Sequence, residues 1–309
     1  MAAEPGGAPW REVGRIELPG VAGRIDHLAM DLEGQRVFVA ALGADEVEVV
    51  DLKAGKRVAR LAGLREPQGV VYLPSTRRLV VAAGESGEVV AFEGDKRVAT
   101  AAALPDADNL RWSAPAGRLV VGYGSGLAIL DSTTLAVVER IALPGHPEAF
   151  ELAEGGPEIY VNVPGAGRIV VVDRRTAKTT AEWPIEPDAA NFPMVLDEAA
   201  HRLVVGTRRP ARLLVFDTGT GRRLSKLPLC EDVDDLFLDR DRQRLLAVCG
   251  EGEVQVWSTA AGAPARPLQR IMTAPGARTG LFVPSIGRLF VAAPARGNAA
   301  AALLVYATP

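Results

Sequence analysis

Seven pairs of residues stand at equivalent positions of a repeated pattern, each just before an apolar run, and could supply the chemistry of one shared site. In six of the seven copies a polar or charged side chain is present there. The pairs are Asp26-His27, Gln68-Gly69, Asp108-Asn109, Glu148-Ala149, Phe192-Pro193 (after Asn191), Asp234-Asp235 and Arg278-Thr279. Carboxylate and amide oxygens suit hard cations such as Ca²⁺. The same residue types also serve as ordinary turn residues that hydrogen-bond local backbone amides, and this alternative stays open.

The acidic members of the set are candidates for binding a divalent cation. If a cofactor is present, we expect Ca²⁺ or another divalent ion, with ligands drawn from Asp26, His27, Asp108, Glu148 and Asp234. His146 precedes Glu148 in the same segment, so it could meet His27 and Glu148. The separation of His27 and His146 is not that of a zinc or copper motif, which argues against a transition metal. His201 falls in a turn on the opposite face.

A second set of residues belongs to the loops that follow the second strand of each copy. These rim candidates are Tyr123, Asn162, Arg208, Arg209 and Arg296. Arginine forks bind carboxylate or phosphate groups, so an acidic arc facing a basic arc would suit a zwitterionic ligand. Alternatively, these arginines and Arg278 pair with Asp232, Asp234 and Asp235 nearby. We expect the carboxylates at the channel mouth to be exposed and to contribute little to stability.

The elements that must position these residues come from a repeat. The phrases are RVFVAA from Arg36, RLVVAA from Arg78, RLVVGY from Arg118, EIYVNV from Glu158, RLVVGT from Arg202, RLLAVC from Arg244 and RLFVAA from Arg288. Their spacings are 42, 40, 40, 44, 42 and 44 residues. A period of about 40–45 residues is typical of propeller blades built from four short strands. Val-rich runs bounded by Gly, Pro, Asp and Ser predict strands, and helix should be nearly absent.

The two ends of the chain predict how the ring closes. The last copy stops one strand short, while EVGRIELPG near the N-terminus matches ERIALPG, the fourth strand of the third copy. We therefore expect the N-terminal strand to complete the last blade and remove an exposed sheet edge. The predicted fold is an all-β, seven-bladed propeller of four antiparallel strands per blade. It forms a single domain over residues 1–309, with residues 1–10 as a flexible tail.

Composition excludes several functional classes. The net charge of −3 gives no general attraction for polyanions, and aromatic residues are only 5% of the chain, so nucleic acid is not an expected partner. No G-x-S-x-G motif and no phosphate-binding loop are present. With two cysteines the chain is not a disulfide-dense scaffold. Cys230 and Cys249 fall at the top of one blade, where we favour two free thiols and leave a disulfide open.

Targeting and membrane signals are weak. The first ten residues lack the basic and apolar regions of a secretory signal, and the longest apolar run has nine residues, too short to span a bilayer. We expect a soluble monomer without a membrane span. It would be cytoplasmic as given, or periplasmic or secreted if a leader was removed.

Several phrases carry a family resemblance that covers essentially the whole chain. They are IDHLAMD, PQGVVYLP, DADNLRW, GHPEAFELA, NVPGAGRIVVVDR, NFPMVLDE, VDDLFLD and ARTGLFVPSIGRLFVAAP. They resemble the bacterial YncE-like, YVTN-type beta-propellers. The resemblance implies a seven-bladed propeller, often exported in bacteria, and transfers no catalytic residue. In composition alone, the acidic set is also similar to the metal site of gluconolactonase-type propeller hydrolases.

Two functional hypotheses follow. The first is a non-catalytic scaffold that binds a small molecule, an ion or a protein at the top-face mouth of the central channel. The second is a divalent-metal-dependent hydrolase or lactonase, and whether the protein is an enzyme stays open. Oxygen ligands from three or more blades converging within about 2.3–2.6 Å of one point would favour the second hypothesis.

Overall fold

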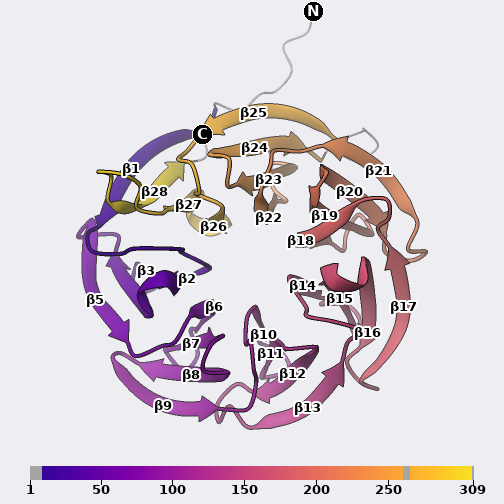
Figure 1. Cartoon of the computed structure of the whole chain (residues 1–309), viewed down its shortest axis with the longest axis horizontal. Helices are drawn as coiled ribbons and strands as arrows, with labels where there is room; N and C mark the ends of the chain where they lie inside the picture. Colours follow the sequence, from indigo (N-terminus) through magenta and orange to yellow (C-terminus); the bar gives the residue numbers. More distant parts are fainter. Residues whose placement is uncertain (1–8, 260–264, 308–309) are drawn as a thin grey trace, which may run out of the picture.

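A computed structural model describes residues 9–259 and 265–307, and in these ranges the chain forms seven antiparallel sheets of four strands each. Figure 1 shows the sheets arranged as blades around a central opening. Helix in these ranges is limited to three short 3₁₀ turns, η1 (Leu42–Ala44), η2 (Pro164–Ala166) and η3 (Pro284–Ile286). The predicted seven-bladed all-β fold is confirmed.

The innermost strand of each blade lines the central channel. Because side chains alternate along a strand, every second residue of these segments faces the channel and the others face the neighbouring strands or blades. The innermost strands are β2 (Leu28–Asp31), β6 (Pro67–Leu73), β10 (Leu110–Ser113), β14 (Phe150–Leu152), β18 (Ala189–Asp197), β22 (Val233–Asp239) and β26 (Thr279–Val283).

The second and third strands form the middle of each blade and are buried on both faces, which explains why their sequences are continuously apolar. The second strands are β3 (Arg36–Ala41), β7 (Arg78–Ala83), β11 (Arg118–Tyr123), β15 (Glu158–Val163), β19 (Arg202–Arg209), β23 (Arg244–Cys249) and β27 (Arg288–Ala293). The third strands are β4 (Glu46–Asp51), β8 (Glu88–Glu93), β12 (Gly126–Asp131), β16 (Arg168–Asp173), β20 (Ala211–Asp217), β24 (Glu253–Ser258) and β28 (Ala301–Ala307).

Among the strands, the outermost carry most of the exposed charged side chains, and such side chains on a free sheet edge discourage pairing with another chain. They are β5 (Lys56–Ala62), β9 (Lys96–Ala101), β13 (Val137–Ala142), β17 (Lys178–Pro184), β21 (Arg223–Pro228), β25 (Arg266–Met272) and β1 (Arg11–Leu18).

The hydrophobic core lies between neighbouring blades. In one cluster, Val37 and Val39 of the first blade pack with Leu18, Phe290 and Leu303 of the last blade, and all five are buried. Each blade therefore depends on its two neighbours, and a break in the ring would expose two such surfaces.

The chain closes the ring as predicted, since β1 is the outermost strand of the last blade. It pairs antiparallel with β28, from Arg11 opposite Ala307 to Leu18 opposite Ala301. Figure 1 shows the two ends of the colour scale side by side in this blade. The predicted tail over residues 1–10 falls mainly on residues 1–8, outside the described residues. At Trp10 the prediction is wrong, because its side chain is buried and packs edge-on against Phe282.

The loops that precede the innermost strands and the loops between the second and third strands lie on one face of the ring, as the sequence predicts. The loop between β3 and β4 touches the segment before β2, where the Gly43 N–H donates a hydrogen bond of 2.9 Å to the carbonyl of Arg24. Close packing here also explains Gly69, because a Cβ at this position would lie 2.2 Å from the carbonyl oxygen of Asp108 in the next blade. At the position of Gly69 the second blade therefore contributes no side chain to the channel, although Gln68 beside it does.

The two cysteines are not free, which corrects the interpretation favoured from the sequence. Cys230, before β22, and Cys249, at the end of β23, form a disulfide with their Cα atoms 6.0 Å apart. Both lie at the top of the sixth blade, as the repeat alignment predicts.

No helix within the described ranges is long and apolar enough to cross a membrane.

Candidate functional site

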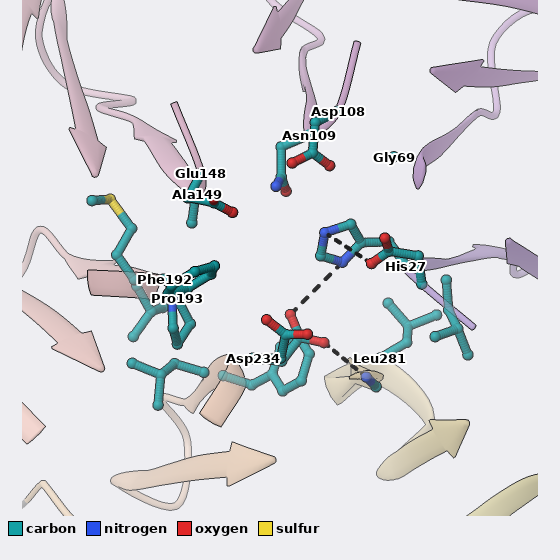
Figure 2. Close-up of a pocket in the computed structure, with 18 of the residues that line it drawn as sticks. His27, Gly69, Asp108, Asn109, Glu148, Ala149, Phe192, Pro193, Asp234 and Leu281 are labelled. Carbon is teal, nitrogen blue, oxygen red and sulfur yellow. Dashed lines mark hydrogen bonds and ion pairs between the residues drawn. The ribbon is translucent and has the colours of Figure 1, made fainter. Parts of the chain in front are cut away.

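The mouth of the central channel is a cavity of about 510 Å³, and all seven blades contribute to its lining. It contains Asp26, Gln68, Asp108, Glu148, Phe192, Asp234 and Arg278, the first member of each predicted pair. Figure 2 shows side chains of this set converging on the channel from different blades. The repeat places these residues together because each precedes an innermost strand at the same end of its blade.

His27 reaches into the middle of the channel (Figure 2). Its Nε2 lies 3.9 Å from Asp26 Oδ1, and its Nδ1 lies 3.9 Å from Asp235 Oδ1. Burial alone would lower the pKa of His27, but the carboxylates of Asp26 and Asp235 outweigh this effect and raise it. The ring of His27 makes no hydrogen bond with the described part of the chain.

The arginines at the mouth pair with nearby aspartates, as the alternative interpretation of the sequence proposed. Arg208 pairs with Asp234 and lies 3.5 Å from Asp232, and its guanidinium lies 3.8 Å from the centre of the Phe192 ring. Arg278 Nη2 lies 3.1 Å from Asp232 Oδ2, and its Nε lies 4.0 Å from Asp234 Oδ2. These two arginines are therefore largely neutralised by the protein and do not form a free basic arc.

On the other side of the mouth, Glu148 has no such partner. Its carboxylate makes no hydrogen bond or ion pair with the residues that the structure describes. Asp108 Oδ2 lies 3.7 Å from His146 Nε2, and His146 Nδ1 lies 3.2 Å from Asp106 Oδ2. This half of the mouth therefore keeps an excess of negative charge.

Burial raises the pKa values of several carboxyl groups at the mouth toward neutral pH. Burial, with the nearby Asp108 charge, raises the pKa of Glu148 to about 7. Burial likewise raises the pKa of Asp234 to about 7, against the opposing effect of Arg208, and that of Asp235 to about 6. The nearby carboxylates of Asp108 and Asp106 raise the pKa of His146 to about 9. Clustered pKa shifts of this kind in a cavity are typical of functional sites.

Not every predicted residue reaches the cavity. The structure brings ten of the eleven predicted mouth residues to its lining, and Arg208 alone of the five rim candidates. Asn191 is fully buried and donates a hydrogen bond of 2.8 Å to Asn162, whose own amide donates to the carbonyl of Phe192. These two asparagines join the fourth and fifth blades. The other rim candidates, Tyr123, Arg209 and Arg296, are outside the cavity lining.

The expected exposure of the mouth carboxylates is also wrong in part. Asp26 is only 2% exposed, and its Oδ2 accepts a hydrogen bond of 2.9 Å from Arg24. Asp108 is 7% exposed. Ring closure narrows the channel so that carboxylates preceding different strands shield each other from water. Replacing Asp26 would consequently disturb a buried ion pair as well as any binding site.

The sequence pattern did not identify five charged residues of the lining. They are Arg24, Asp106, Arg111, Glu151 and Arg240. Arg111 and Glu151 could have been found, because each lies two positions after a predicted pair member, Asn109 and Ala149, and so shares its channel-facing side. Arg24 precedes the first innermost strand, so the alternation of side chains along a strand does not predict where its side chain points.

The mouth residues do not fit a divalent metal. A metal site would need donor atoms from at least three ligands close together, and among the described residues only Cys230, Glu251 and Glu253 meet this condition within 4.8 Å. That group does not suit a metal either, because Cys230 is in the disulfide and Glu253 pairs with Arg270. The candidate ligands Asp26, His27, Asp108, Glu148 and Asp234 form no such group, which counts against a metal-dependent hydrolase.

The raised pKa values predict that the protein becomes less stable as pH rises. The folded protein retains protons on Glu148, Asp234 and Asp235 that the unfolded chain releases near its ordinary carboxyl pKa, and His146 loses its favourable charge only toward pH 9. All four groups therefore lower the free energy of unfolding between about pH 4 and pH 9. Over this pH range, the free energy of unfolding of Glu148→Gln should decrease by about 1–2 kcal/mol less than that of wild type, allowing for solvent screening.

Urea unfolding at constant ionic strength from pH 5 to pH 9 measures this dependence. Glu139→Gln, an exposed change on β13, is the matched control and should leave the slope unaltered. An identical pH slope for wild type and Glu148→Gln would show that Glu148 is not protonated more readily in the folded state.

Comparison with solved structures confirms the fold. A chain from "Crystal Structure of Mitotic Checkpoint Complex" superposes with a TM-score of 0.81 and 14% identity, covering 100% of this chain and 95% of that one. A chain from Kuenenia stuttgartiensis hydrazine synthase superposes with a TM-score of 0.78, also at 14% identity, covering 89% and 95%. No family model and no curated protein matches the sequence. At this identity the likeness is one of fold, and the chain is similar to these proteins as a seven-bladed β-propeller.

Proposed function

We propose that the protein is a non-catalytic binding scaffold whose ligand is a small polar molecule held at the mouth of the channel. The observation that carries this proposal is the cavity of about 510 Å³, lined by charged groups from separate blades. Its volume lies within the roughly 300–1,000 Å³ typical of small-molecule sites. Glu148 supports the proposal further, because a carboxylate without a protein partner in such a cavity is available to a ligand.

The proposal also includes the family kinship, the class of partner and the oligomeric state of the protein. The quoted sequence phrases support kinship with the YncE-like propellers. The net charge of −3 and the acidic mouth disfavour nucleic acid as the partner. We expect a monomer, because closure of the ring by β1 leaves each blade with four strands and no blade incomplete. A protein partner is the alternative occupant of the same face. A chain of similar fold belongs to a mitotic checkpoint complex, which supports this alternative.

The test is a thermal-shift and calorimetric screen of small cations, anions and zwitterions against wild type. For any cation or zwitterion that binds, Glu148→Gln should weaken the affinity about tenfold, the cost of one charged hydrogen bond. His201→Gln is the matched control, because His201 is exposed in the turn between β18 and β19, away from the mouth. Full affinity in Glu148→Gln together with a loss in His201→Gln would place the site on the other face.

A further inference from the structure

The mouth and the floor of the channel differ in the charged group that the protein leaves without a full partner, a carboxylate at the mouth and a guanidinium at the floor. Residues two apart on an inner strand face the same side, so Arg111 lies one level below Asn109, and Glu151 lies one level below Ala149. At this lower level the remaining channel-facing residues of the cavity lining are apolar, among them Val195, Phe237 and Leu281. The mouth, in contrast, carries six carboxylates, among them Asp108 and Glu148, beside three arginines and two histidines.

The floor carries a positive charge that the protein only partly satisfies. Arg111 Nη1 donates to Asn109 Oδ1 at 3.3 Å and to the carbonyl of Leu110 at 3.0 Å. Its Nη2 lies 3.8 Å from Glu151 Oε1, beyond hydrogen-bond distance, and its Nε donates to no group in the described residues. Glu151 is also attracted to Arg240, so two arginines share one carboxylate. The guanidinium also lies 5.5 Å from the centre of the Phe150 ring, so the Nε–Nη2 edge of Arg111 is what remains available to a ligand.

The mouth carries the complementary negative charge. Arg208 and Arg278 are occupied by Asp232 and Asp234, so they do not neutralise the opposite side. Glu148 remains without a partner, and Figure 2 shows its carboxylate beside the channel, near Asn109 and Asp108. Glu148 and Arg111 belong to neighbouring blades, the fourth and the third, so a single small ligand bound on this side can reach both.

We propose that the ligand is a small zwitterion, with an ammonium group bound by Glu148 and Asp108 at the mouth and a carboxylate bound by Arg111 at the floor. This inference rests on the proposed function of the same cavity. An ammonium group donates three hydrogen bonds to carboxylate acceptors, whereas a guanidinium fork matches a carboxylate with two parallel bonds. The apolar side chains at this level, among them Phe237, lower the local dielectric constant and strengthen that contact. His27 fills the central side of the cavity, between Asp26 and Asp235.

The experiment uses ω-amino acids of increasing length, from glycine to 6-aminohexanoate, with butylamine and butanoate as single-charge probes. Isothermal titration calorimetry with the full chain should find one length that binds at least about tenfold more tightly than either single-charge probe. Glu148→Gln should remove this advantage over butanoate, and Arg111→Gln should remove it over butylamine.

Because Arg111→Gln leaves Glu151 with one partner fewer, the double variant Arg111→Gln, Glu151→Gln tests the same contact at unchanged net charge. His201→Gln is again the control. If butylamine binds as tightly as every ω-amino acid and Arg111→Gln has no effect, the zwitterion inference is wrong while the binding site stands. If none of the probes binds wild type, the zwitterion inference fails. A mouth ligand of another class from the wider screen would then preserve the proposed function, and no ligand there would end it.

Discussion

Deleting residues 1–20 should abolish cooperative folding of the ring, because it removes β1 from the last blade. Trp10, Ile16 and Leu18 are each no more than 8% exposed. Burial of a large apolar side chain contributes about 1.5–3 kcal/mol, so the three together contribute about 5–9 kcal/mol. This is comparable to the roughly 5–15 kcal/mol that separates folded from unfolded domains. Urea unfolding followed by circular dichroism should show no cooperative transition in the truncated chain.

Polar contacts add to this effect. Gln269 on β25 donates a hydrogen bond of 2.9 Å to the carbonyl of Trp10, and its Oε1 accepts one of 3.0 Å from the Trp10 N–H. The deletion would therefore also expose polar groups on the sixth blade. Deletion of residues 1–8 is the matched control, because it leaves β1 and Trp10 in place. A truncated chain that lacks residues 1–20 yet melts at the wild-type temperature would contradict the role of β1.

A peptide of residues 9–20 offers a sharper version of the same test. Added to the truncated chain, it should restore the cooperative transition by pairing with β28 as β1 does. The same peptide carrying Ile16→Asp and Leu18→Asp should not, because both side chains enter the buried cluster between the last and first blades. Rescue by the charged peptide would show that β1 contributes only backbone pairing.

The fold was predictable because the repeat encodes it several times. Each copy of the phrase beginning at Arg78 or Arg202 has the same apolar run, and the packing of one blade on the next imposes the same requirement at every copy. Closure followed from a missing strand at one end and a matching segment at the other. These are consequences of local pattern, which one sequence can reveal.

The site was only partly predictable because the direction of a side chain depends on contacts between blades. Asn191 has the residue type of a ligand-binding side chain, yet the neighbouring blade presents Asn162, and the two bond to each other. Arg208 lies at the mouth as expected, but Asp234 is close enough to neutralise it. Arg111 was detectable from strand alternation, whereas the partial satisfaction of its guanidinium appears only in three dimensions.

Removing the disulfide should cost about 3 kcal/mol of unfolding free energy. Cys230 and Cys249 are 19 residues apart, and cross-linking a loop of this length restricts the unfolded chain by about that amount. We expect the double variant Cys230→Ala, Cys249→Ala to unfold at a lower urea concentration, with a steeper dependence on denaturant because its unfolded chain is less compact. Protein recovered from an oxidising compartment should show no free thiol when it is denatured and alkylated without reductant.

The same change should also weaken ligand binding at the mouth. Asp232 and Asp234 follow Cys230 by two and four residues, and they hold Arg208 and Arg278 in place. Without the disulfide, this segment is anchored by backbone bonds such as the one from Gly250 N–H to the carbonyl of Asp232 at 2.8 Å. Wild type treated with reductant while unfolded and then refolded is the control and should match the double variant. If the double variant retains full stability, the cross-link does not constrain the unfolded chain. If it loses stability but keeps full affinity, the backbone bonds alone position the sixth-blade aspartates.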